Sequence, residues 1–155
     1  MSNIYFPVGL GLVLALGANP SVWTARLEGK DGSKISGTAR VETVAPMTPP
    51  ADSTKPPANE SGSQELRVTV TVSGAPQNSS LSFDLRSGKC SMPGAVIGTP
   101  ASYGTIKADD KGNGNATAQI KGPAPTGEFH VSVYSAGQKP AACGDLEQSK
   151  TSTEG

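Results

Sequence analysis

The chain has 155 residues, enough for one domain, and its 13 Lys and Arg balance its 13 Asp and Glu. Because the chain has no net charge and no cluster of basic residues, it lacks the positively charged surface that nucleic-acid binding requires, and we exclude a nucleic-acid partner. Hydrophobic residues make up 35% of the chain, and 19 Gly with 13 Pro indicate many short strands joined by tight turns.

The N-terminal segment is apolar, and the first 25 residues contain no Asp, Glu, Lys or Arg. Residues 8–18 form a run of the length of a signal-peptide core, with small residues at its end that suit a cleavage site. Residues 1–18 are therefore predicted to be a signal peptide. The alternative is a membrane anchor over residues 4–23, with Tyr5 and Trp23 at the interface. Both interpretations place the folded part outside the cytoplasm, periplasmic or secreted, with the anchored form on the outer side of the membrane.

Two strands are predicted next, at residues 23–28 and 35–44, joined by a turn at residues 29–32. Residues 45–64 contain five prolines and hardly any large apolar residue. They are predicted to form a solvated, extended loop inserted in the domain, because such a segment cannot supply a core strand. The loop is a spacer in one interpretation and a functional segment in another.

The period of two that is typical of half-buried strands runs through much of the remaining chain. It is clearest at residues 66–73, where four apolar side chains alternate with polar ones. Further strands are predicted at residues 81–86, 105–108, 116–120 and 129–135, with turns at 74–79, 109–114 and 122–127. Residues 90–100 are expected to be irregular, residues 135–142 to connect the last strand to Cys143, and residues 147–155 to form a flexible polar tail. The fold class is thus all-β, with seven to eight antiparallel strands in a sandwich or flattened barrel.

The two cysteines, Cys90 and Cys143, lie 53 residues apart in the sequence. In an exported chain an even pair favours a disulfide over a metal or catalytic site, and the alternative is two buried free thiols. Three N-glycosylation acceptor patterns begin at Asn59, Asn78 and Asn115 and matter only in a eukaryotic secretory route. The sequence has no Gly-x-Ser-x-Gly, phosphate-loop or Cys-x-x-Cys motif.

Four stretches, taken in order over residues 23–146, resemble the copper/zinc superoxide dismutases. The first runs from Leu66-Arg-Val-Thr-Val-Thr-Val-Ser-Gly74 through Ser82-Phe-Asp-Leu-Arg86 to Gly88-Lys-Cys90; the others are Tyr103-Gly-Thr-Ile-Lys-Ala-Asp109, residues 127–135, and Ala142-Cys-Gly-Asp-Leu146. The resemblance implies a Greek-key β-barrel of the sandwich kind over residues 23–146. It also implies a bond between Cys90 and Cys143.

The metal ligands of that family are not present in this chain. The resemblance places Asp84 and Arg86 at the first two copper-binding His, Tyr134 at the His of the late strand, and Ser102 at the zinc-binding Asp. Imidazole suits both metals, whereas hydroxyl and guanidinium groups do not form such sites. Sliding the match by one residue would put Phe83 and Leu85 at the copper positions, and we reject it because it turns the apolar face outward.

The sole histidine, His130, alternates with apolar neighbours and is predicted to lie on the outward face of its strand with Ser132 and Tyr134. We expect an exposed strand residue without a special role. The alternative is a metal ligand paired with Asp84, or a proton-transfer group. Asp84, Arg86 and Tyr134 are expected to form a salt bridge and a hydrogen bond where the family holds its metal.

These observations predict a non-catalytic, exported structural or binding module that uses no cofactor and docks onto a protein partner. With the N-terminal segment retained, it would be an accessory subunit of a membrane-associated assembly. The alternative is a divergent dismutase or metal-binding enzyme that uses His130. A third hypothesis is a scavenging or chaperone-like surface protein that uses residues 45–64 as bait.

Overall fold

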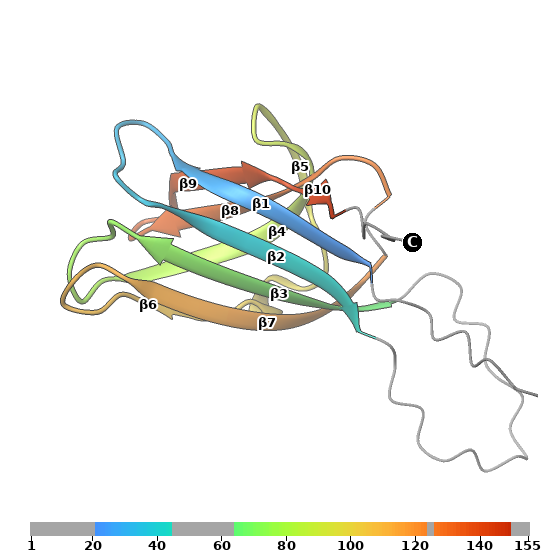
Figure 1. Cartoon of the computed structure of the whole chain (residues 1–155), viewed down its shortest axis with the longest axis horizontal. Coiled ribbons are helices and arrows are strands. Elements are labelled where there is room, and N and C mark those ends of the chain that lie inside the picture. The colour runs from blue at the N-terminus through green and yellow to red at the C-terminus, as the bar shows by residue number, and fades with distance from the viewer. Residues whose placement is uncertain (1–20, 45–63, 124–125, 150–155) are drawn as a thin grey trace, which may run out of the picture.

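The computed structural model describes residues 21–44, 64–123 and 126–149 (Figure 1). The predicted signal peptide or anchor and the Pro-rich loop lie outside the described residues, apart from residues 21–23 and 64. Within the described part of the chain, no helix has the length and apolar character needed to cross a membrane.

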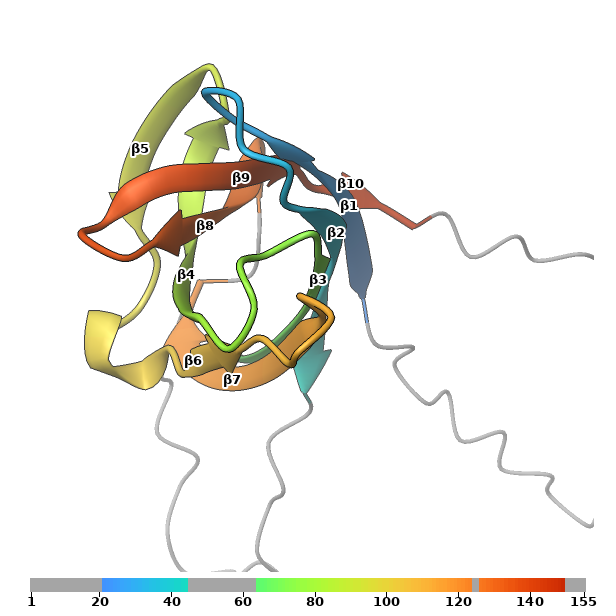
Figure 2. The ribbon, with the colours of Figure 1, turned by 90° about the vertical axis from the view of Figure 1, so that its left-hand side faces the viewer.

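The described chain is all-β, as predicted, and forms one curled antiparallel sheet with the shape of a half-barrel (Figures 1 and 2). Eight strands follow the order β5-β4-β8-β9-β1-β2-β3-β7, while β6 pairs with β4 and β10 pairs with β1. The strands are β1 Val22–Gly29, β2 Ser36–Val44, β3 Gln64–Ser73, β4 Ser80–Lys89, β5 Met92–Val96, β6 Thr105–Lys107, β7 Gly114–Gly122, β8 Phe129–Ser135, β9 Lys139–Asp145 and β10 Glu147–Gln148, with a 3₁₀ turn η1 at Pro100–Ser102.

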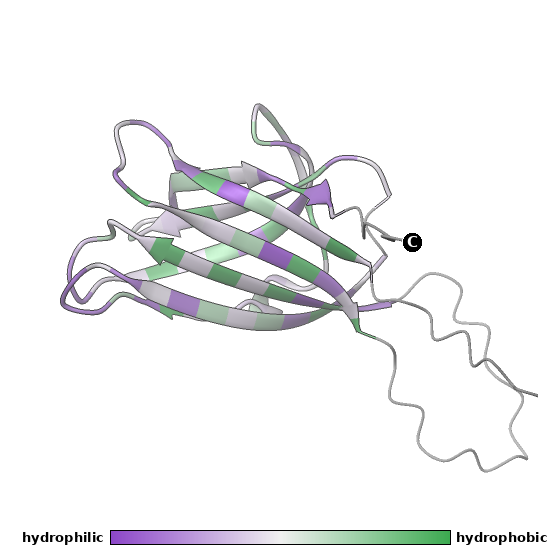
Figure 3. Cartoon of the chain, in the orientation of Figure 1, coloured by the Kyte–Doolittle hydropathy of each residue, from purple (hydrophilic) through white to green (hydrophobic). Residues whose placement is uncertain are grey.

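Side chains that alternate along the strands build the core on the concave side of this sheet. Figure 3 shows hydrophobic and hydrophilic residues alternating along several strands. In β3 the four apolar residues from Leu66 to Val72 are at most 1% exposed, and the polar residues between them point the other way. In β4, Phe83 and Leu85 are likewise buried, which places Asp84 and Arg86 on the convex side. The face assignment made from the sequence is therefore confirmed for both strands.

The predicted turns at residues 29–32, 74–79 and 109–114 are present, and the last of them shows why its sequence forms a turn. The predicted turn at residues 122–127 includes residues 124–125, which lie outside the described residues. The Asp109 carboxylate accepts hydrogen bonds from the backbone N–H groups of Lys111 at 2.9 Å and Asn113 at 2.8 Å. Gly112 takes a positive φ of 80°, which glycine adopts without strain. The side chain of Asp109 thus closes the connection between β6 and β7.

Three strands were not predicted. Residues 92–96 were expected to be irregular but form β5, an exposed edge strand whose Pro and Gly have low β-propensity. The segment leading to Cys143 is strand β9, where burial against β8 compensates for small residues. Residues 147–148 of the expected polar tail form β10 on β1. Each of these strands is specified by its neighbours rather than by an alternating pattern of its own.

Tyr103 ties the segment after β5 to the core. Its ring packs edge-on against Phe83, with ring centroids 5.7 Å apart, and its hydroxyl donates to the carbonyl of Ile97 at 2.6 Å. Burial, with a smaller contribution from the charge of Asp84, raises the pKa of Tyr103 well above that of a free phenol, although the Leu85 carbonyl opposes this. The phenol therefore stays protonated in the folded protein at moderately alkaline pH.

Tyr103→Phe is expected to lower the free energy of unfolding by about 1 kcal/mol at neutral pH, because it removes the bond to Ile97. The folded-state pKa is raised, so this Tyr stabilises the fold fully below about pH 10 and loses that contribution as the pH rises further. Denaturant unfolding at increasing alkaline pH should show a shallower loss of stability in the variant than in the wild type. Parallel losses in the two proteins would contradict the assignment.

Candidate functional site

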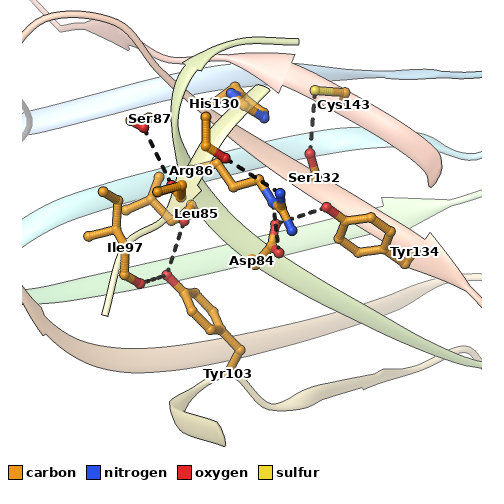
Figure 4. A network of polar contacts seen from close by, with 12 residues as sticks. Asp84, Leu85, Arg86, Ser87, Ile97, Tyr103, His130, Ser132, Tyr134 and Cys143 are labelled. Atoms are coloured by element: carbon orange, nitrogen blue, oxygen red, sulfur yellow. Dashed lines mark hydrogen bonds and ion pairs between the residues drawn. The ribbon is translucent and has the colours of Figure 1, made fainter. Parts of the chain in front are cut away.

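A polar cluster lies on the convex side of β4 and β8, directly behind the core. Asp84 of β4 stands opposite Ser132 of β8, and Arg86 stands opposite His130. Tyr134 follows on the same face of β8, because alternate residues of a strand share a face. Figure 4 shows these side chains gathered on one surface of the sheet. The cluster therefore results from the pairing of two strands whose other faces form the core.

Asp84, Arg86 and Tyr134 form one hydrogen-bonded network (Figure 4). The Arg86 Nε donates to Asp84 Oδ2 at 3.0 Å, and the Tyr134 hydroxyl donates to Asp84 Oδ1 at 3.3 Å. The guanidinium carbon of Arg86 also lies 5.9 Å from the centre of the Tyr134 ring, within cation–π range. The salt bridge and the hydrogen bond expected from the sequence are both present.

The network affects the protonation of Arg86 and Tyr134. Burial alone would lower the pKa of Arg86, but the hydrogen bond and charge of Asp84 outweigh it and the pKa is raised. Burial also raises the pKa of Tyr134, although the nearby Ser132 hydroxyl opposes this. Near neutral pH the site thus presents a permanent cation and a neutral phenol, neither of which is a good metal ligand.

His130 is not the exposed residue that the sequence predicted. It is 0% exposed, and its Nδ1 lies 2.9 Å from the carbonyl oxygen of Gly88. Because a carbonyl only accepts, Nδ1 carries the proton, and Nε2 is left as a buried atom with no partner among the described residues. The alternation of β8 placed His130 on the correct face, but there the ring is buried and contacts Gly88 near the end of β4.

The predicted disulfide joins Cys90, in the turn between β4 and β5, to Cys143 in β9 and holds this turn in place. Two further bonds fix the turn. The Cys90 backbone N–H donates to Asp145 Oδ1 at 2.7 Å, and Lys30 Nζ donates to the Cys90 carbonyl at 3.0 Å. The disulfide thus lies at one end of the polar cluster, beside His130.

A surface hollow of about 540 Å³ opens beside the disulfide. Ser132 and His130 contribute to it from β8, Arg86 and Tyr134 flank them, and Lys30 reaches it from the connection between β1 and β2. Lys30 was not predicted as a site residue, because the sequence around a lysine in a turn does not indicate that folding brings it close to Cys90. Ser102 does not line the hollow and lies exposed in η1, so it is not part of this site.

In the parts of the chain that the structure describes, no three His, Cys, Asp or Glu side chains are grouped so that they could hold a metal ion. No protein-family model matches the chain, and no curated protein matches its sequence.

Proposed function

We propose that this chain is a non-catalytic binding module that acts outside the cytoplasm, built on a dismutase-like barrel, and that it docks onto a protein partner. The observation that carries the proposal is the network of Asp84, Arg86 and Tyr134. These residues occupy the positions at which the resemblance places copper-binding histidines, and they satisfy one another instead of leaving electron pairs free for a metal.

The path of the chain supports a Greek-key arrangement. Strands β1, β2 and β3 are neighbours, and the chain then crosses to β4 on the far side of the half-barrel. It returns in β7 beside β3, crosses again to β8 beside β4, and continues into β9 beside β1. Connections of this kind, between strands that are not adjacent in the sheet, are typical of Greek-key barrels and sandwiches, the fold that the resemblance implies. A fold of this kind hosts many functions, so activity must be argued from the site.

The chemistry of the site favours binding over catalysis. Arg86 is a permanent positive charge that repels a metal cation, and its partner Asp84 is already engaged by two donors. The buried His130 ring contacts the Gly88 carbonyl and does not face Asp84 in any described hydrogen bond. The residues present are suited to holding a polar group of a partner in a fixed orientation.

Protein purified without added metal is expected to contain neither copper nor zinc in stoichiometric amount and to consume no superoxide. Elemental analysis, native mass spectrometry and a superoxide-consumption assay measure this directly. The native mass also reveals signal cleavage and any co-purifying chain. A stoichiometric copper or zinc ion would overturn the proposal.

The second candidate function is metal binding through His130, and the unpartnered Nε2 of this residue is the observation that favours it. Its Nδ1–H donates to a backbone carbonyl, an arrangement common in metal-binding histidines. In a copper titration this function predicts saturable changes in the backbone amide signals around His130, and these changes are absent in His130→Gln. The non-catalytic module predicts no saturable change in either protein.

A further inference from the structure

The hollow beside the disulfide is rich in hydrogen-bond donors that the fold leaves partly unused. Arg86 donates its Nε to Asp84, and its guanidinium also lies near the Tyr134 ring. Among the described residues it makes one further hydrogen bond, a 3.5 Å contact with the Gly94 carbonyl. A guanidinium carries five N–H groups, so several remain available. Lys30 Nζ donates one hydrogen bond, to Cys90, and forms no ion pair with the described residues. Both cations line the hollow.

Ser132 adds a neutral donor at the base of the same hollow. Ser132 is only 7% exposed, and its hydroxyl lies 3.7 Å from the Cys143 sulfur and close to the side chain of Tyr134. A disulfide sulfur is a weak acceptor, so the hydroxyl proton is free to turn toward a better one. Figure 4 shows Ser132 between Cys143 and Tyr134 on the face of the sheet that bears Arg86.

The charges around the hollow suit a single negative charge. Asp84 neutralises much of Arg86, whereas Lys30 has no carboxylate partner among the described residues, and the exposed Asp31 lies at the rim. One uncompensated cation with hydrogen-bond donors on either side matches a ligand that carries one negative charge. A phosphate with two negative charges would be repelled more strongly by the carboxylates of Asp31 and Asp84. A carboxylate also offers two planar acceptor oxygens to the guanidinium and ammonium donors.

We infer that the hollow formed by Lys30, Arg86, Ser132 and Tyr134 beside the Cys90–Cys143 disulfide is a binding site for a carboxylate, carried by a small molecule or by an acidic side chain of a partner. This inference rests on the proposed binding function and names the group that the site recognises. The carboxylate lies over Ser132, with Lys30 on one side and Arg86 on the other. The disulfide fixes the position of Lys30 through the Cys90 carbonyl.

NMR titration of the full chain tests the site, because the chain contains one His and its imidazole signals report on a single place beside the hollow. The probes are acetate, lactate and the blocked peptide acetyl-Gly-Glu-Gly-amide, each exchanged against chloride at constant ionic strength. Saturable shifts of His130 and its neighbours with acetate or lactate assign a free carboxylate as ligand. Saturation by the peptide alone assigns an acidic side chain of a partner. The absence of saturable shifts with all three probes overturns the inference.

A matched pair of lysine variants separates specific binding from general attraction. Lys30→Gln is expected to weaken carboxylate binding about tenfold, because it removes a charge-assisted hydrogen bond. Lys34→Gln removes the same charge from the same connection between β1 and β2, but Lys34 does not line this hollow. The Lys34→Gln variant should therefore bind the carboxylate with the affinity of the wild type. Ser132→Ala should weaken binding several-fold without loss of charge. Equal losses in the two lysine variants would overturn the assignment.

The two proposals fail in different ways. Absence of carboxylate binding in a protein free of copper and zinc rejects this site and leaves the non-catalytic module in place. Stoichiometric copper or zinc in the purified protein rejects the module itself, whatever the carboxylate titration shows.

Discussion

Replacing both Cys90 and Cys143 by Ser is expected to lower the free energy of unfolding by about 4 kcal/mol. The bond joins residues that are 53 positions apart, and closing a loop of that length removes much of the conformational freedom of the unfolded chain. A single domain of ordinary stability has only about 5–15 kcal/mol in total, so this is a large part of it. The structure adds a local consequence, because the disulfide also holds the turn between β4 and β5, which lies beside the same hollow as His130.

Denaturant unfolding with and without a reducing agent measures the effect. The wild type should lose stability on reduction, and the double variant, which has no thiol left, should be unaffected by the same treatment. Hydrogen exchange at the Cys90 amide, which is bonded to Asp145, should accelerate in the variant. A change in unfolding free energy below about 1 kcal/mol would show that other contacts hold the turn.

The strands that could be predicted are those with one face in the core and one in water. In β3 and β4 the alternation of residues such as Val68 and Phe83 with polar neighbours determines both the strand and its inward face. Strand β5 has no such alternation, because it is an exposed edge strand. In β8 five consecutive residues are buried, since the convex side is covered as well. The period of two therefore assigns the faces of a strand without showing what covers the second face.

The candidate site was predictable to the extent that it follows from strand pairing. Asp84, Arg86 and Tyr134 were expected together from the resemblance and from alternation, and the structure brings them into one network. The burial of His130 was missed because it depends on a contact with a residue far earlier in the chain, Gly88 of β4. Lys30 was missed for the same reason, since its place depends on the position of the Cys90 carbonyl.

Leu85→Ala is expected to lower the free energy of unfolding by about 2–5 kcal/mol, whereas Arg86→Ala should cost only about 1 kcal/mol. The two residues are adjacent in β4 but face opposite sides of the sheet. Leu85 is 0% exposed in the core, so truncating it leaves a cavity that the surrounding strands fill only in part. Arg86 is 29% exposed, and Asp84 keeps the Tyr134 hydroxyl as a partner when the guanidinium is removed.

Chemical denaturation of both variants measures this difference, with Arg67→Ala as the control. Arg67 lies on the exposed face of β3, and its loss should change the free energy of unfolding by no more than about 0.5 kcal/mol. If Arg86→Ala lowered the free energy of unfolding as much as Leu85→Ala, Arg86 would be assigned to the core and the two faces of β4 would be exchanged. The network would then no longer occupy the surface at which the resemblance places a metal, and the proposed binding site would lose its basis. The larger loss in Leu85→Ala is thus the measurement on which the position of the whole site depends.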